Sequence, residues 1–196
     1  MNPSARRTLA IIFVLFTASL LGGCAAVVVG GTAAGASVAH DRRTVGTVVE
    51  DKEILLRAMR LRGDDPDLTQ RSNIDITVYN LQVLLTGQAE SSDIVARFAQ
   101  QVAKIARVRK VINEVTIGAE ETWGEATGDA YLTTRVKLAI FDVGIEGFDP
   151  LRVKVVSSQG TVYLMGLLKP EEADAVTDKV RYISGVKKVV RLFEYI

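Results

Sequence analysis

The sequence has one cysteine and one histidine, and aromatic residues make up only 6% of its 196 residues. A single cysteine excludes an internal disulfide and a zinc site built from several cysteines. One histidine likewise argues against a histidine-rich metal centre. The charge is nearly balanced, with 24 Lys and Arg against 23 Asp and Glu, which argues against a broadly basic nucleic-acid binder. The length suits one or two modest domains.

The start of the chain has the pattern of a secretory signal peptide. Arg6 and Arg7 precede an uncharged, mostly apolar run at residues 8–21, and Gly22 and Gly23 follow. The run is shorter than the roughly 20 residues that a spanning helix needs, and its order favours a signal peptide at residues 1–23. A buried core helix is the alternative. The paired arginines also suggest twin-arginine export, but their neighbours match that signal poorly, which favours the general secretory route.

The end of this segment carries a second motif. The run Leu21-Gly22-Gly23-Cys24 resembles the lipobox of bacterial lipoproteins, which is cleaved just before its cysteine. The resemblance implies that Cys24 is the lipidation site, with a diacylated thiol and an acylated amino group. Three acyl chains exceed the two signals that stable anchoring requires. Because Ala25 and not aspartate follows, the resemblance further implies the outer membrane, with the body facing the periplasm. A chance buried cysteine is the alternative.

Removal of the signal changes the composition. It takes away two of the 24 basic side chains and none of the 23 acidic ones, so the mature chain keeps 22 basic side chains and a net charge of −1. Residues 24–46 begin with small, glycine-rich, uncharged sequence, which predicts a flexible tether. His40 is expected to be an exposed residue of this tether. No later segment could cross a bilayer, so we expect a body that is held to the membrane by lipid.

The sequence after the tether contains a tandem repeat of one unit. At an offset of 79 residues Ile74 matches Val153 and Gly87 matches Gly166, and at an offset of 78 Asp51 matches Asp129. Apolar spacing predicts helices at residues 51–61 and 129–141, each with its aspartate as N-cap. A hairpin, a second helix and a last strand follow in each copy. The order is therefore α-β-β-α-β, twice.

Three details of the units depend on backbone conformation. Asn80 tolerates the positive φ of the first hairpin turn, and Gly160 serves the second turn. Pro170 and the acidic residues after it suit the first turn of a helix.

Since domains of about 70 residues bury only about 60% of their surface, we expect the two copies to pack together.

These marks resemble the BON domain. The second strand of each copy ends in Val-x-Leu-x-Gly, and the second copy also has Gly-Val-x-x-Val after its second helix; the residues concerned are Val83, Leu85, Gly87, Val162, Leu164, Gly166, Gly185, Val186 and Val189. The first copy departs from the pattern, because Arg107 replaces the helix-ending glycine and Leu81 replaces the turn glycine. The resemblance implies an α+β fold with two tandem BON domains, in which the helices pack on one face of a small three-stranded mixed sheet.

The expected layout is a first BON domain at residues 47–118, a linker at 119–127 and a second BON domain at 128–196. Together with the lipobox, it resembles the two-domain outer-membrane lipoproteins of this family. That resemblance implies binding to anionic phospholipid through the second domain and support of outer-membrane integrity at division sites. The alternative is a non-catalytic adaptor that binds proteins of outer-membrane assembly or cell-wall remodelling.

The first helix of the second domain is the expected lipid-binding element. Leu132, Val136, Ala139 and Ile140 can serve the core, which leaves the candidate lipid-binding residues Tyr131, Arg135, Lys137, Leu138 and Phe141 on another face. Aromatic rings settle among headgroups while cations attract phosphate. The alternative is that Tyr131 and Phe141 pack against the sheet or the other domain. The corresponding helix of the first domain has no aromatic residue, which predicts weaker membrane binding.

The sequence predicts no enzyme. His40 lies in the tether, and Ser157-Ser158 lacks the context of a nucleophile elbow. The adjacent acidic pairs, such as Glu171-Glu172, have side chains that diverge, and no glycine-rich loop joins a strand to a helix. We therefore expect no cofactor, no metal and no nucleic-acid partner. Trp123, in the linker, is expected to anchor the two domains together or to mark a partner site.

Overall fold

The computed structural model describes residues 41–118 and 123–196, and the side chains of 123–127 are outside that description. Residues 41–196 form one compact unit. Within the described part, no helix is long and apolar enough to cross a membrane. Several predictions fall outside the described residues: the predicted signal peptide, the predicted lipidation site Cys24, His40 and most of the predicted tether. The side chain of Trp123 is outside them as well.

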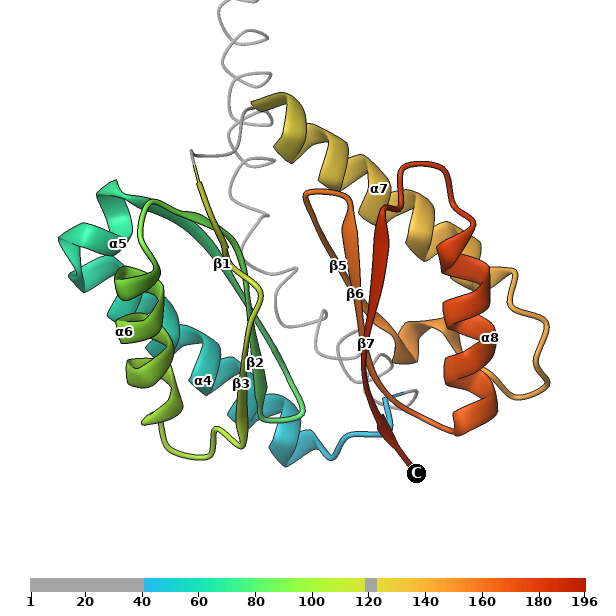
Figure 1. Cartoon of the computed structure of the whole chain (residues 1–196). Helices are drawn as coiled ribbons and strands as arrows, with labels where there is room; N and C mark the ends of the chain where they lie inside the picture. The colour runs from blue at the N-terminus through green and yellow to red at the C-terminus, as the bar shows by residue number, and fades with distance from the viewer. Residues whose placement is uncertain (1–40, 119–122) are drawn as a thin grey trace, which may run out of the picture. The chain divides into compact units, whose positions relative to one another are not determined.

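The first domain has its helices over one face of a sheet (Figure 1). Its elements are helix α4 (Val45–Asp64), the short helix α5 (Pro66–Gln70), strands β1 (Ser72–Tyr79) and β2 (Gln82–Ala89), helix α6 (Ser92–Ala103), and strands β3 (Lys110–Asn113) and β4 (Thr116–Ile117). Strand β2 pairs antiparallel with β1 and parallel with β3 and β4. Helix α4 begins two residues before the predicted domain start, and α5 was not predicted.

The second domain repeats this plan. Its elements are helix α7 (Trp123–Phe141), a 3-10 turn η2 (Pro150–Arg152), strands β5 (Lys154–Ser158) and β6 (Thr161–Leu168), helix α8 (Pro170–Arg181) and strand β7 (Lys188–Tyr195). Strand β6 pairs antiparallel with β5 and parallel with β7 along its whole length. The predicted α+β fold with mixed sheets is therefore confirmed, and helix α8 starts at the predicted Pro170.

The last strand differs between the two domains. In the first domain it is divided into β3 and β4, and the side chain of Asn113 accepts the Val115 backbone N–H at 3.2 Å at the break. This local turn of an Asn side chain competes with ladder pairing. In the second domain β7 runs without a break.

Each sheet buries one face under its own helices. Ile54, Ile74, Val83 and Phe98 belong to the first core, and Leu132, Val136, Val155 and Val176 belong to the second. Because side chains alternate across a strand, strand residues next to those of the core point to the opposite face of each sheet. There Tyr79 and Leu84 of the first domain form a third cluster with Tyr163 and Met165 of the second. The predicted packing between the copies is thus observed.

The two repeat aspartates have a role that the sequence did not predict. Helix α4 is capped by Thr44, whose hydroxyl accepts the Thr47 N–H at 3.1 Å, and not by Asp51, which lies buried inside the helix. The Asp51 carboxylate accepts the backbone N–H groups of Asn80 and Leu81, both at 2.7 Å. The N-cap prediction for Asp51 is therefore wrong, because a tertiary contact to the hairpin turn uses its carboxylate instead.

Asp129 repeats this arrangement in the second domain. It lies within α7 and is not its N-cap, and its carboxylate accepts the N–H groups of Gln159 at 2.5 Å and Gly160 at 2.9 Å. Both hairpin turns have two successive residues with positive φ, Asn80 and Leu81 in one and Gln159 and Gly160 in the other. This is the geometry of a type I′ turn. The predicted positive φ at Asn80 and Gly160 is confirmed.

Candidate functional site

The exposed face of α7 gathers the residues predicted to bind lipid. Tyr131, Leu138 and Phe141 are 65%, 64% and 61% exposed, and Lys137 is also exposed. Leu138 lies seven positions after Tyr131 and three before Phe141, so the three share one side of the helix. The core side of α7 consists of Leu132, Val136 and Ile140, which are buried. The alternative, in which Tyr131 and Phe141 pack against the sheet or the other domain, is not what the structure shows.

Arg135 lies beside Tyr131 on this face. Its guanidinium is 5.8 Å from the centre of the Tyr131 ring, which is within the range of a cation–π contact. It also donates a hydrogen bond of 3.0 Å to the carbonyl of Ser184 in the loop after α8. Arg135 has no ion pair among the described residues. The ring and the carbonyl hold its side chain in place, while its charge remains available to an anion.

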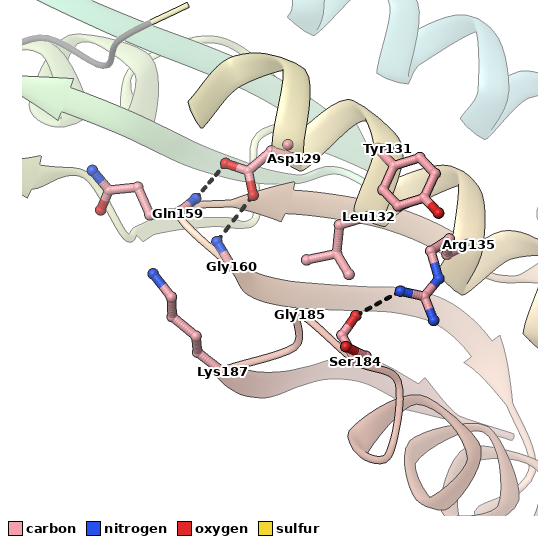
Figure 2. A pocket seen from close by; sticks show the side chains of 10 residues that line it. Asp129, Tyr131, Leu132, Arg135, Gln159, Gly160, Ser184, Gly185 and Lys187 are labelled. Atoms are coloured by element: carbon pink, nitrogen blue, oxygen red, sulfur yellow. Dashed lines mark hydrogen bonds between the residues drawn. The ribbon is translucent and has the colours of Figure 1, made fainter. Parts of the chain in front are cut away.

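A hollow of about 680 Å³ lies next to these residues. Figure 2 shows Tyr131, Leu132 and Arg135 of α7 on one side and Lys187 on the other, with Gly160 and Gly185 at its edge. Asp129 also lines it, but both of its oxygens accept N–H groups of the hairpin turn. Its negative charge remains, but the two cations of Arg135 and Lys187 outnumber it, so the hollow favours an anionic ligand.

A second hollow of about 240 Å³ lies at the other end of the helix. Lys137 and Phe141 line it together with Leu151 and Lys154, which come from η2 and β5. Desolvation and the neighbouring Lys137 charge lower the pKa of Lys154. The two lysines at this hollow would both attract an anion. Sequence reasoning missed Leu151, which is 65% exposed, and Lys154, because the fold alone brings them to the end of α7.

Several basic and aromatic side chains outside α7 make contacts within the fold. Arg107 pairs with Glu50, and Arg109 binds Glu194 of the second domain at 2.6 Å. Tyr163 is buried in the cluster between the domains, where burial and Glu114 raise its pKa to about 12.

The residues just before α4 tie the first domain to the second. The guanidinium of Arg42 donates to both carboxylate oxygens of Glu172, at 2.5 and 2.8 Å, and to the carbonyl of Leu167. Glu172 is only 3% exposed. Its burial raises its pKa, but the hydrogen bonds from Arg42 and from the Lys169 backbone lower the pKa by more, so the net shift is downward. Arg43 binds Asp51 at 2.7 Å and lies 4.0 Å over the Tyr79 ring.

Comparison with known proteins identifies the repeated unit. The BON domain family model matches residues 51–119 and again residues 128–196. Outer membrane lipoprotein DolP of Haemophilus influenzae is 34% identical over 197 residues, which is all of both chains. The 21 kDa hemolysin of Actinobacillus pleuropneumoniae is 30% identical over 156 residues, or 80% of this chain and 79% of that one.

A solved structure of CdsD, a structural protein of the Type III secretion system of Chlamydia trachomatis, is also matched, with 14% identity over 74% of this chain and 63% of that one. Its TM-score of 0.28 is too low to carry an argument. Neither curated relative has a name that denotes an enzyme. The two family matches and the full-length relative agree with the repeat, the two mixed sheets and the α+β order, so the chain belongs to the BON-domain family, as a two-domain member related to an outer membrane lipoprotein.

Proposed function

We propose that this chain is a periplasm-facing outer-membrane lipoprotein, anchored through Cys24, that binds anionic phospholipid with the exposed face of α7. The observation that carries the proposal is the joint exposure of Tyr131, Leu138 and Phe141 beside Arg135 and Lys137. A monomeric soluble domain rarely exposes such an apolar group unless it contacts a partner or a membrane. The resemblance of residues 21–24 to a lipobox supports the anchor, and the full-length likeness to an outer membrane lipoprotein supports the location.

The chemistry of α7 suits an anionic interface. The rings of Tyr131 and Phe141 and the side chains of Leu138 and Leu151 would enter the boundary between headgroups and acyl chains. Arg135 and Lys187 line one hollow, and Lys137 and Lys154 line the other. Each basic side chain near an anionic surface contributes about 1 kcal/mol of attraction, which falls off with salt. Membrane binding is therefore expected to require anionic lipid and to weaken as the salt concentration rises.

The test is sedimentation of residues 41–196, the compact unit, with vesicles of phosphatidylglycerol and phosphatidylethanolamine. The protein should sediment with them at low salt, be released by high salt, and stay in solution with vesicles of phosphatidylcholine. The triple variant Tyr131→Ser, Leu138→Ser, Phe141→Ser should lose most of the binding. A matched control is Val49→Ser, Leu56→Ser, Met59→Ser, which removes three exposed apolar side chains from α4. Equal binding by the two triple variants would contradict the role of α7.

The cellular part of the proposal is support of outer-membrane integrity at division sites. A second membrane contact through α7 would add to the lipid anchor, so the body would lie against anionic regions of the bilayer instead of hanging from its tether. A fluorescent fusion should enrich at the division site, and this enrichment should weaken in the α7 triple variant while the protein stays in the outer membrane. The variant Cys24→Ser should release the protein into the periplasm. An unchanged pattern in the α7 variant would refute the link between lipid binding and position.

A further inference from the structure

Helix α4 of the first domain exposes a stripe of side chains that the lipid-binding proposal does not use. Val45, Val49, Leu56 and Met59 are 63%, 59%, 65% and 50% exposed, and the exposed Lys52 lies between them. We call these five residues the α4 stripe. The core side of the same helix is formed by Ile54 and Ala58, which are buried. The stripe is thus a second apolar face on a helix that already packs on its own sheet.

The spacing of the α4 stripe indicates the shape of what covers it. Its members follow one another at intervals of four, three, four and three residues, over three turns or more. This is the seam of a coiled coil, in which one helix receives the side chains of another. A helix that lies in a membrane interface has a wider apolar face with aromatic residues. The α4 stripe is narrow and contains aliphatic residues and a methionine, so it suits a helix better than a bilayer.

The charges indicate the partner's chemistry. Lys52 lies within the stripe and Arg60 lies beside it, and neither has an ion-pair partner among the described residues. The nearby Glu53 is already paired with Arg57 at 2.5 Å. The face therefore offers unpaired positive charge to a helix that contacts it. A second copy of α4 is disfavoured, because symmetric pairing in register would place one Lys52 against the other.

We propose that the α4 stripe binds an amphipathic helix of a partner protein that carries an acidic residue opposite Lys52. Apolar side chains of that helix would lie between Val49 and Leu56 and between Leu56 and Met59. The acidic residue would form an ion pair with Lys52, which fixes the register as well as the partner. Lipid would then bind at α7 of the second domain and protein at α4 of the first, so one chain could hold a protein partner at the membrane.

The experiment uses the full-length lipidated chain in its native host, with the photoreactive residue p-benzoylphenylalanine in place of Leu56. The control places the same residue at Gln100, which is exposed on α6. Irradiation should crosslink position 56, and not position 100, to a protein whose crosslinked segment is an amphipathic helix with an Asp or Glu. Lys52→Glu should lower the yield at least tenfold, and Lys52→Gln should give an intermediate loss. An acidic-to-lysine change in the partner helix should restore binding to the Lys52→Glu chain.

Three results would overturn the proposal. Crosslinks to lipid would assign the α4 stripe to the membrane, and crosslinks to a second copy of this chain would assign it to self-association. Absence of a crosslink specific to position 56, or a yield that Lys52→Glu leaves unchanged, would show that no acidic helix binds there. The control is thermal unfolding of each Lys52 variant. A midpoint close to that of the parent protein shows that a lower crosslinking yield reflects weaker binding and not loss of the fold. The α7 triple variant should crosslink normally, so failure of lipid binding and failure of this proposal are distinguishable.

Discussion

Asp51 and Asp129 occupy the same position in the two BON domains, and each carboxylate holds the turn of its own hairpin through two backbone N–H groups. The helices that carry these aspartates expose different surfaces. The α4 stripe consists of aliphatic residues, a methionine and a lysine, whereas α7 exposes Tyr131, Leu138 and Phe141. The two copies therefore share the contacts that hold the hairpin turn and differ in the side chains on the exposed face of the first helix. We expect one domain to bind protein and the other lipid.

The two domains also differ in backbone strain. Leu81 and Arg107 have φ values of 65° and 74° in the first domain, while Gly160 and Gly185 occupy the corresponding places in the second, with φ values of 78° and 98°. A residue with a Cβ atom costs about 1–2 kcal/mol more than glycine in this region. The first domain thus tolerates strain at two turns that the second domain avoids. Five predictions test this comparison.

The largest expected effect concerns the glycine that ends the Val-x-Leu-x-Gly motif. A Cβ at Gly87 would lie 2.0 Å from the carbonyl oxygen of Asn73, and φ there is 104°. A Cβ at Gly166 would lie 2.8 Å from the carbonyl oxygen of Arg152. We expect Gly87→Ala to lower the free energy of unfolding by about 4 kcal/mol and Gly166→Ala by about 2 kcal/mol. Urea unfolding of residues 41–196 measures both, and a larger effect at Gly166 would reverse the comparison.

Removal of the turn-holding carboxylates should have the next largest effect. Asp51 is 4% exposed and binds Arg43 in addition to two N–H groups, whereas Asp129 is less buried and has two N–H partners. Because buried donors without a partner cost about 1–3 kcal/mol, Asp51→Ala should cost about 3 kcal/mol and Asp129→Ala about 2 kcal/mol. Thermal unfolding gives the order. Equal losses would mean that Arg43 adds nothing to the first turn.

The contact between the domains should be weakened by Arg42→Ala. The change leaves the buried carboxylate of Glu172 with only the more distant guanidinium of Arg152, at 3.7 Å. It should cost about 2 kcal/mol, less than the loss of a fully buried pair, because Arg42 is partly exposed. The matched control is Arg57→Ala, which breaks an exposed pair with Glu53 and should cost under about 0.5 kcal/mol. If the two losses are equal, Arg42 does not stabilise the domain contact.

Three carboxylates give the protein a dependence on pH, and two of them, Glu172 and Glu194, belong to the contact between the domains. The carboxyl groups of Asp41, Glu172 and Glu194 all have a pKa below the usual range. Burial raises each pKa, but hydrogen bonds lower it by more. Arg43 donates to Asp41, Arg42 donates to Glu172, and Asn80 and Arg109 donate to Glu194. A lowered pKa contributes stability above the unfolded-state value, about 4, and that stability is lost as the pH falls below it. The thermal unfolding midpoint should therefore decrease as the pH is lowered below about 4. The decrease should be less steep for the Arg42→Ala variant. Parallel curves for the two proteins would contradict this.

The smallest effect concerns the residue after the second helix of each domain. Arg107→Gly should raise the free energy of unfolding by about 0.5 kcal/mol, because relief of strain exceeds the loss of unfolded-state order and of an exposed ion pair. Gly185→Ala should lower it by about 1 kcal/mol, since φ there is 98°. Urea unfolding of both variants gives the signs. Destabilisation by Arg107→Gly would show that its pair with Glu50 outweighs the strain.

The sequence predicted those features of the fold that depend on local pattern and on the repeat. Alternating and helical spacing indicated the element order, and Asn80 and Gly160 indicated the hairpin turns. It failed where a tertiary contact uses a residue that also suits a local role. Asp51 suits an N-cap, but its carboxylate binds the hairpin, and Thr44 caps the helix instead.

The candidate site was predicted in part for the same reason. The positions of Tyr131, Leu138 and Phe141 followed from the helical period, because Val136 and Ile140 mark the core side. Leu151 and Lys154 could not be assigned to this site, since only the folded chain brings η2 and β5 to the end of α7. The sequence places Arg42 in the predicted tether. Its ion pair with Glu172 joins residues 130 positions apart, and no pattern in the sequence near Arg42 indicates such a contact.

The central claim is that α7, and not α4, enters the membrane, and lipid quenching of a fluorophore tests it most directly. Residues 41–196 contain no cysteine, so a single cysteine at position 138 or at position 56 can carry the probe on an exposed site of either helix. With phosphatidylglycerol vesicles that contain brominated lipid, the probe at position 138 should be quenched and the probe at position 56 should not. Quenching at position 56 alone, or equal quenching at both positions, would contradict the account.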